Sequence, residues 1–299
     1  MDAPFWGFQV HSKGNWWLCS ACYCVPICGG IGIMMDNIAR SGIRMVEGYF
    51  GFLKFIGYQA TLVDEALSQL AGHGEVPPMH LRMRVHGRPD LGSFLDVGSR
   101  CAQDLQAALA TQGKQFADFG QILDFGCGSG RTLRWVTKLA PQSQLYGTDI
   151  DGDAIAWVQG HLDYVSASVN GQKAPLPYPG DSFDLIYSIS VFTHMDEEHQ
   201  FFWLEELRRV MRPGGLLLAS LHGHDLWKAF PPEAVKQLQQ EGVFVAKTRL
   251  WDGVFPEWYQ NTYHSVEYVT SNFGKYFDVV DYLPLALDAN HDIAILRKR

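Results

Sequence analysis

The sequence has few basic residues and hardly any basic runs. It contains 24 Lys and Arg residues against 32 Asp and Glu residues, for a formal net charge of -8, and its one Lys/Arg run longer than two residues is Arg297–Arg299. Nucleic-acid-binding proteins usually carry a basic patch or stripe. The charge balance therefore argues against DNA or RNA as a partner and favours a small-molecule substrate.

Cysteine is also sparse outside one segment. Four of the six cysteines lie between Cys19 and Cys28, and Cys101 and Cys127 are isolated. Disulfide frameworks belong to short secreted chains, so we expect a reducing, cytoplasmic compartment. The spacing Cys-x2-Cys-x-Cys-x3-Cys differs from the paired Cys-x2-Cys arrangement of zinc sites, and we predict no metal.

Residues Trp16–Met35 have no charged side chain. The segment is long enough to be considered as a membrane span, but Pro26 and three glycines would break a helix there. We favour an apolar arm that packs on the main domain, or a translation start at Met34 or Met35. Peripheral membrane contact through residues 16–35, with or without lipidated cysteines, is the alternative. The role of residues 1–35 stays open.

The remaining composition is that of a globular protein, with 47% hydrophobic and 19% charged residues among 299. Apolar residues recur at helical spacing over 36–70, and Asp90–Leu109 looks helical with a break around Gly98. We therefore divide the chain into an N-terminal segment (1–35), a helical region or lid over part of the active site (36–110), and a catalytic domain (111–299).

A strand, a glycine-rich turn and a helix follow one another from residue 121. The apolar run Ile122–Phe125 contains Asp124 and leads into Gly126, Gly128 and Gly130, and the helix is expected over Arg131–Ala140. Glycines permit positive φ angles and close approach of the backbone to a ligand. A second apolar strand, Gln144–Thr148, ends at Asp149, where a carboxylate can accept hydrogen bonds from ribose hydroxyls.

Two kinds of ligand compete for this turn. A dinucleotide site has the pattern G-x-G-x-x-G, but Arg131 stands where the third glycine would be. Asp124, directly before the glycines, would repel a pyrophosphate and would favour a cationic ligand. The local pattern therefore fits a ligand with an ammonium group and a ribose better than it fits a dinucleotide.

The segment Ile122–Gly130 resembles the first motif of the class I S-adenosylmethionine (SAM)-dependent methyltransferases. Gly147–Asp151 is similar to their second motif, Ser182–Ser188 to their fourth strand, and Leu207–Gly215 to their following helix and tight turn. The four motifs occur in the family's order, and the resemblance extends from about Ser93 to the C-terminus. It implies a doubly wound, Rossmann-like α/β sheet of seven strands with SAM as the cofactor.

The resemblance also implies roles for individual residues. Gly126, Gly128 and Gly130 would pass close to the methionine part of SAM, and Asp124 would hold its amino group. Asp149 would bind the ribose hydroxyls. Ile150 would flank the adenine, Asn170 would lie near the adenine amino group, and Ser188 would line the cofactor side of the pocket.

The rest of the domain is expected to hold the acceptor. We predict a helix over Glu197–Val210, a strand over Gly215–Leu221, a helix over Phe230–Glu241 and two last strands, Tyr276–Leu283 and Asp292–Arg297, the final one antiparallel. Between them lies an aromatic-rich insertion at about 242–272. Its candidate substrate-binding residues are Trp258, Tyr259, Tyr263 and His264.

Two histidines are candidate general bases. His194 follows the fourth strand and His222 follows the fifth, at the strand ends that face the cofactor, and histidine titrates near neutral pH. The alternative is that each caps backbone groups in a loop. We expect methyl transfer from SAM to an oxygen, nitrogen or carbon atom of a small molecule. A non-catalytic SAM-binding or interaction domain and another SAM-fold transferase are the alternatives. The sequence leaves the oligomeric state open.

Overall fold

The computed structural model describes residues 75–88, 90–246 and 258–299. The predictions for the segment 1–35 and for the helix over 36–70 lie outside these residues. The chain divides into two compact units, residues 1–95 and 96–299. None of the described helices is both long and apolar enough to cross a membrane.

In the first unit, the described residues form α2 (Met79–His86) and the start of α3 (Leu91–Thr111). Helix α2 ends at Gly87, which has a φ of 71° and donates its N–H to the carbonyl of Met83. The Asp90 carboxylate accepts hydrogen bonds from the backbone N–H and the hydroxyl of Ser93, so it fixes the first turn of α3.

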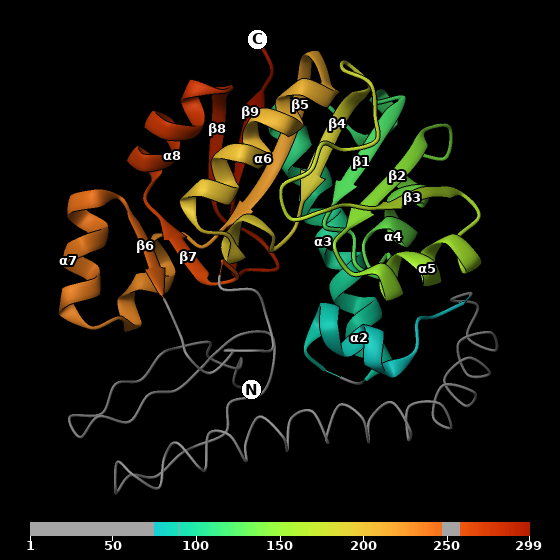
Figure 1. The fold of residues 1–299 in the computed structure, drawn as a ribbon, viewed down its shortest axis with the longest axis horizontal. Helices are drawn as coiled ribbons and strands as arrows, with labels where there is room; N and C mark the ends of the chain where they lie inside the picture. Colours follow the sequence, from blue (N-terminus) through green and yellow to red (C-terminus); the bar gives the residue numbers. More distant parts are fainter. Residues whose placement is uncertain (1–74, 89, 247–257) are drawn as a thin grey trace, which may run out of the picture. The chain divides into compact units, whose positions relative to one another are not determined.

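The second unit is built on one seven-stranded sheet in the order β3-β2-β1-β4-β5-β9-β8 (Figure 1). Strands β1 to β5 are parallel, and β9 runs antiparallel to both β5 and β8. The predicted sheet of seven strands with an antiparallel final strand is confirmed. The bounds are β1 (Gln121–Phe125), β2 (Gln144–Asp149), β3 (Val165–Val169), β4 (Phe183–Ser188), β5 (Met211–Leu221), β8 (Asp278–Leu287) and β9 (His291–Arg297).

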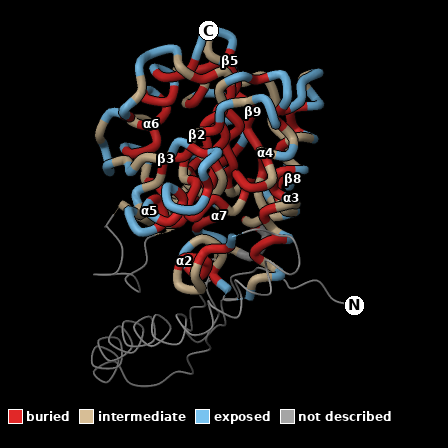
Figure 2. The backbone as a smooth tube through the Cα atoms, turned by 90° about the vertical axis from the view of Figure 1, so that its right-hand side faces the viewer, coloured by how far each residue is buried: buried red, intermediate tan, exposed pale blue. Residues whose placement is uncertain are grey.

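Helices cover both faces of this sheet, because side chains alternate between its faces along each strand. One face packs on α6 (Glu197–Val210) and α8 (Val266–Asn272), and its core includes Phe125, Trp203 and Leu217. The other layer holds α3, α4 (Leu133–Leu139) and α5 (Gly152–His161) (Figure 1). Figure 2 shows the buried backbone concentrated in the strands between these layers.

Gly98 does not break α3, so the predicted interruption is wrong. The helix runs continuously from Leu91 to Thr111. A Cβ atom at Gly98 would lie 2.4 Å from the carbonyl oxygen of Arg131. The glycine is therefore there because the backbone after the glycine-rich turn passes very close to α3.

The predicted tight turn at Arg212–Gly215 lies inside a longer strand. β5 begins at Met211, and its register with β4 shifts between the pairs Phe183–Met211 and Leu185–Leu216. Gly214, with a φ of 78°, lies in this irregular part. The turn chemistry was therefore recognised correctly, but the chain forms a bulge and continues in the sheet.

A second, two-stranded sheet lies beyond the carboxyl ends of β4 and β5. It consists of β6 (Val243–Ala246) and β7 (Asn261–His264), and α7 (Pro232–Glu241) precedes it. Just before β7, Tyr259 forms an isolated antiparallel bridge with Met195, which lies in the segment after β4. Within the predicted insertion, residues 247–257 lie outside the described part of the chain.

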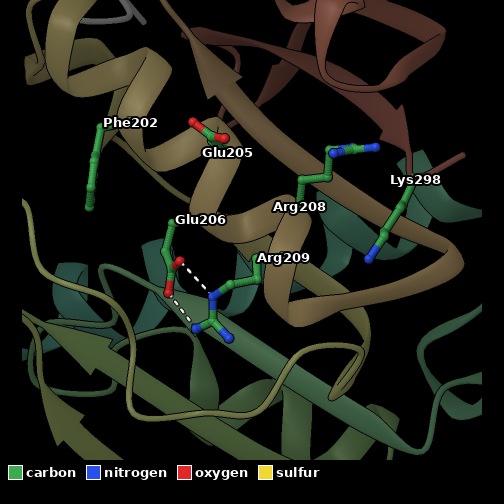
Figure 3. A pocket seen from close by; sticks show the side chains of 6 residues that line it. All are labelled: Phe202, Glu205, Glu206, Arg208, Arg209 and Lys298. Atoms are coloured by element: carbon green, nitrogen blue, oxygen red, sulfur yellow. Dashed lines mark hydrogen bonds and ion pairs between the residues drawn. The ribbon is translucent and has the colours of Figure 1, made fainter.

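At the opposite ends of the strands of the large sheet, a surface hollow is lined by residues of α6 and by Lys298 (Figure 3). The buried Glu206 carboxylate accepts hydrogen bonds from Arg209 at 2.6 and 2.8 Å and from the backbone N–H of Leu176 at 2.6 Å. It ties the loop before β4 to α6. The neighbouring Glu205 is exposed. This hollow lies at the amino ends of the strands, whereas ligands of such sheets bind at the carboxyl ends.

Glu206→Ala is expected to lower the free energy of unfolding by about 2–4 kcal/mol, because it leaves a buried N–H and a guanidinium without their shared acceptor. Urea titration of the full chain measures this change. Glu205→Ala is the matched control and should shift the value by less than about 0.5 kcal/mol. Equal effects of the two substitutions would contradict the assignment.

Candidate active site

The glycine-rich turn joins β1 to α4 at the carboxyl edge of the sheet. Gly126, Gly128 and Gly130 have φ angles of 85°, 53° and 74°, in the region that favours glycine. The N–H groups of Gly126 and Cys127 bond to the carbonyl of Thr148 at 2.7 and 3.0 Å. The turn is therefore held against the end of β2 by its own backbone.

Glycine is also required at position 126 because there is no room for a Cβ atom. A Cβ atom at this position would lie 2.1 Å from a Cγ atom of Val191, which follows β4. The loop after β4 thus packs directly on the glycine turn. Within that loop Ser190 has a φ of 57°, and its N–H bonds to the Ser220 hydroxyl on β5 at 2.7 Å. Uncommon backbone conformations of this kind often occur at functional sites.

Asp149 connects the turn to the end of β2. Its carboxylate accepts a hydrogen bond from the N–H of Gly128 at 2.7 Å and another from the N–H of Asp151 at 2.8 Å. Burial raises the pKa of Asp149, and these two backbone N–H groups act in the opposite direction. The carboxylate is thus fixed in place with lone pairs remaining for further donors.

Asp124 is almost fully buried, at 2% exposure, and lies beside Tyr187 in the register of β1 and β4. Burial raises the pKa of Asp124 to about 8, and the charge of Asp149 raises it further. The Tyr187 hydroxyl and the positive charge of Arg131 lower it. The neighbours of Asp124 therefore stabilise its ionised form only in part. A cationic ligand bound at this edge would stabilise that form further.

Exposed apolar side chains and buried polar atoms without partners both lie at this carboxyl edge of the sheet. Ile150 and Val169 are 45% and 53% exposed, which is unusual for large apolar side chains at strand ends. Several buried polar atoms here have no hydrogen-bond partner within the part of the chain that the structure describes. They are Ser129 Oγ, Thr148 Oγ1, Asn170 Oδ1 and Ser188 Oγ. Buried polar atoms are normally satisfied, so these fit a ligand that brings its own polar groups and an apolar ring.

The two predicted bases, His194 and His222, lie close together. Their ring centroids are 6.2 Å apart, at an angle of 86°. His194 stacks on Tyr259 at 4.7 Å, and His222 stacks on Tyr263 at 4.8 Å. The ring of His291, at the start of β9, lies 4.9 Å from that of His222. We call His194, His222 and His291 the histidine cluster.

The aromatic residues of the cluster are placed by backbone hydrogen bonds. The N–H of Gln260 bonds to the carbonyl of His194 at 3.0 Å, and the N–H of His264 bonds to the carbonyl of His222 at 2.9 Å. The segment 259–263 therefore lies along the ends of β4 and β5. Tyr259 and Tyr263, which were predicted to bind the substrate, thus lie beside the two predicted bases.

All three imidazoles of the cluster are neutral at pH 7. Burial lowers the pKa of His194 to about 4 and of His291 to about 3. Burial and then the charge of His291 lower the pKa of His222 well below its ordinary value. Neutral imidazoles can both donate and accept hydrogen bonds, but with these pKa values they are weak bases.

Two predicted substrate-binding residues lie elsewhere. His264 has no exposed surface, and its Nε2 atom pairs with Gln200 Oε1 at 3.0 Å, so a substrate cannot reach it. Trp258 stacks on His199 of α6 at 4.7 Å and packs against the core. The His264 side chain thus fills the space between β7 and α6, and the half-buried Trp258 side chain covers α6.

His291 was missed by the sequence analysis. It is the first residue of β9, far along the chain from any recognised motif, and only the antiparallel pairing of β9 with β5 brings it to His222. Among the described residues, no group of three or more His, Cys, Asp or Glu side chains is arranged to hold a metal ion.

Comparison with known proteins agrees with this geometry. A family described as "Methyltransferase domain" matches residues 123–219, which run from β1 to β5. This match identifies residues 123–219 as a methyltransferase domain. The 1,6-didemethyltoxoflavin-N1-methyltransferase of Burkholderia thailandensis has a similar fold, with a TM-score of 0.50 and 12% identity over 98% of this chain and 99% of that one.

Curated relatives are similar over the methyltransferase domain. The chain is 34% identical over 103 residues to a probable tocopherol O-methyltransferase of Oryza sativa subsp. japonica, covering 32% of this chain and 27% of that protein. It is 28% identical over 112 residues to a tRNA N(3)-cytidine methyltransferase of Gallus gallus, covering 34% and 30%. The chain thus spans less than a third of the length of either relative.

Gly126→Ala is expected to destabilise the fold by about 2–4 kcal/mol, through a strained positive φ and the clash with Val191. Gly113→Ala separates these causes, since Gly113 has a φ of 66° but a Cβ there would meet nothing within 4 Å. It should cost only about 1–2 kcal/mol. In a double-mutant cycle, Val191→Ala should recover part of the Gly126→Ala loss. Full additivity of the pair would rule out the clash.

Proposed function

We propose that this protein is a SAM-dependent methyltransferase that acts on a small-molecule acceptor. The observation that carries the proposal is the glycine turn tied to Asp149 at the carboxyl edges of β1 and β2. There, backbone, carboxylate and unsatisfied polar atoms converge with two exposed apolar side chains. This is the position at which open α/β sheets bind their ligands.

The residues present fit the parts of SAM. Asp149 would accept hydrogen bonds from the two ribose hydroxyls, while Ile150 would flank the adenine ring. Asn170 Oδ1, buried and without a partner among the described residues, is suited to accept a hydrogen bond from an amino group of adenine. Asp124 would face the ammonium group of the methionine part, directly or through water. Ser188 would line the pocket beside the glycine turn.

Methyl transfer is a displacement at carbon, and the contribution of the protein is mainly to align the two reactants. SAM, when bound, supplies a methyl group on a positively charged sulfur. Tyr259, Tyr263 and the histidine cluster would hold the acceptor at the ends of β4 and β5. His194 and His222 are the candidate groups that accept a proton from the acceptor or donate a hydrogen bond to it.

A small molecule suits the surface better than a nucleic acid does. The run Arg297–Arg299, the one basic run in the sequence, is used in the fold. Lys298 bonds to Asp181 at 2.6 Å, and Arg299 bonds to Asp278 at 2.7 Å. The net charge of -8 agrees with this assignment.

The division into 1–35, a lid over 36–110 and a catalytic domain remains part of the proposal, as does a cytoplasmic location.

Removing the ribose contact tests the cofactor site. Asp149→Ala should weaken SAM binding by about 10- to 150-fold, the effect of losing hydrogen bonds to a charged group. Isothermal titration of the full chain measures it. Asp163→Ala, at an exposed carboxylate beyond α5, is the control and should leave the affinity unchanged. A folded Asp149→Ala protein with unaltered affinity would refute this role, and a folded wild-type protein without SAM affinity would refute the proposed function.

Binding of SAM should release protons. The pKa of Asp124 is about 8 in the free protein, so the group is largely protonated at pH 7, and a cation beside it lowers that pKa. Affinity should therefore increase from pH 6 to pH 8. Titrations at pH 7 in two buffers of different ionisation enthalpy measure the proton count. Asp124→Asn should abolish this release, and an unchanged proton count would show that another group titrates.

The same shift has a consequence for stability. The folded-state pKa of Asp124 lies above the ordinary value of 3.8, so the free protein loses stability as pH rises from about 4 to about 8. At pH 8.5, Asp124→Asn should stabilise the ligand-free protein by on the order of 2 kcal/mol while weakening SAM binding. Thermal unfolding with and without SAM measures both effects. A destabilised Asn variant at this pH would contradict the assignment.

A further inference from the structure

The polar side chains on the acceptor side of the site are imidazoles and phenols, each of which can donate a hydrogen bond. His194 follows β4, His222 follows β5, and His291 begins β9. Tyr259 and Tyr263 stack on two of these rings. From the glycine turn, the positive charge of Arg131 lowers the pKa of His291, which places the guanidinium within electrostatic reach of the cluster.

The carboxylates near this cluster are engaged with other partners. Asp292 accepts hydrogen bonds from the Tyr282 hydroxyl at 2.8 Å and from the Leu285 N–H at 2.9 Å, both on β8. Asp124 interacts with Tyr187 and Arg131, both of which lower its pKa. Over the residues that the structure describes, none of the three clustered imidazoles has a carboxylate as hydrogen-bond partner.

The other contacts of the three rings are with neutral groups. His222 Nδ1 lies 3.2 Å from the carbonyl of Thr262, and His194 Nε2 lies 3.4 Å from the Ser190 hydroxyl. A backbone carbonyl and a hydroxyl fix ring orientation without supplying a full negative charge. Among the described residues, the cluster therefore has no negatively charged hydrogen-bond partner, and a substrate could provide one.

The possible acceptors differ in whether the cluster must remove a proton from them. An alcohol or an ammonium group must lose a proton to become nucleophilic, and buried imidazoles that resist protonation remove such a proton poorly. A carboxylate is ionised at pH 7 and needs no base. It also accepts hydrogen bonds from imidazole N–H and tyrosine O–H groups.

We propose that the methyl acceptor is a carboxylate, held by the histidine cluster with Tyr259 and Tyr263, so that the product is a methyl ester. This inference rests on the proposed function. One carboxylate oxygen forms a bond to the methyl carbon while the bond between that carbon and sulfur breaks. The electron pair of the broken bond stays on sulfur, which gives S-adenosylhomocysteine, and the transfer itself moves no proton.

The histidines then bind the substrate instead of deprotonating it. A carboxylate beside the cluster favours the protonated imidazole, so carboxylate binding should take up a proton and become stronger as pH falls. The ester is neutral and loses this attraction. The same cluster that holds the substrate therefore favours release of the product.

Matched acceptors test the proposal. The full chain is incubated with SAM labelled in the methyl group and with phenylacetate, 2-phenylethanol or 2-phenylethylamine, and then with the corresponding eight-carbon straight-chain acid, alcohol and amine. A methyl ester releases labelled methanol in mild base, whereas methyl ethers and methylamines do not. Base-labile label from the acids alone is the expected result.

The other outcomes separate this inference from the proposed function. Base-stable label from an alcohol or an amine overturns the carboxylate proposal and leaves the methyltransferase assignment intact. Failure of every acid to bind to protein loaded with S-adenosylhomocysteine also overturns it. Absence of SAM binding by the folded protein refutes the proposed function itself.

Substitution of the cluster distinguishes binding from base catalysis. His222→Gln and His291→Gln keep a hydrogen-bonding side chain but cannot be protonated. Each should raise KM for the acid by about tenfold or more, with kcat changed by less than about threefold, and should remove the proton uptake on acid binding. His161→Gln, at an exposed position on α5, is the matched control. A fall in kcat of about 10²-fold or more at unchanged KM would instead identify a general base.

Discussion

The hydrogen bond from the Gly128 N–H to the Asp149 carboxylate is the interaction on which the site depends. It joins the turn after β1 to the end of β2 over 2.7 Å, and the same carboxylate organises the start of α5 through the Asp151 N–H. Asp151 in turn caps α5 by accepting from two N–H groups of its first turn. A site built this way is in place before any ligand arrives, so little of the binding energy is needed to order it.

The electrostatics of the site are divided between its two sides. On the cofactor side, burial raises the pKa of the Asp124 and Asp149 carboxyl groups, and both groups suit a ligand with positive charge. On the acceptor side, the imidazoles are neutral for the opposite reason, since burial disfavours their cations. Binding of a cation therefore favours ionised carboxyl groups on the first side, and binding of an anion favours protonated imidazoles on the second. In the proposed reaction, methyl transfer removes the positive charge of the sulfur and the negative charge of the acceptor carboxylate, which favours dissociation of the products.

Sequence reasoning found the features that are coded within one short segment. The strand, the three glycines and the two acids could be predicted because each acts through its immediate neighbours, and the doubly wound sheet of seven strands followed from the family resemblance. It failed where distant segments meet. Gly98 was interpreted as a helix break because its reason, the carbonyl of Arg131, lies in another element. His291 was missed and His264 was included because burial and ring contacts depend on the pairing of β9 and β7 with the rest of the fold.

The packing of Cys127 gives the glycine turn a resistance to oxidation. This thiol lies between the first two glycines of the turn, is 4% exposed, and has its pKa raised well above the ordinary value by burial and by the nearby acids. Oxidants and alkylating reagents attack thiolates that solvent can reach. A Cβ atom at Gly147 would lie 2.8 Å from the sulfur, so glycine at this position leaves the room that the buried thiol occupies. The segment that holds the cofactor can therefore keep a cysteine without becoming a redox-sensitive point of the protein.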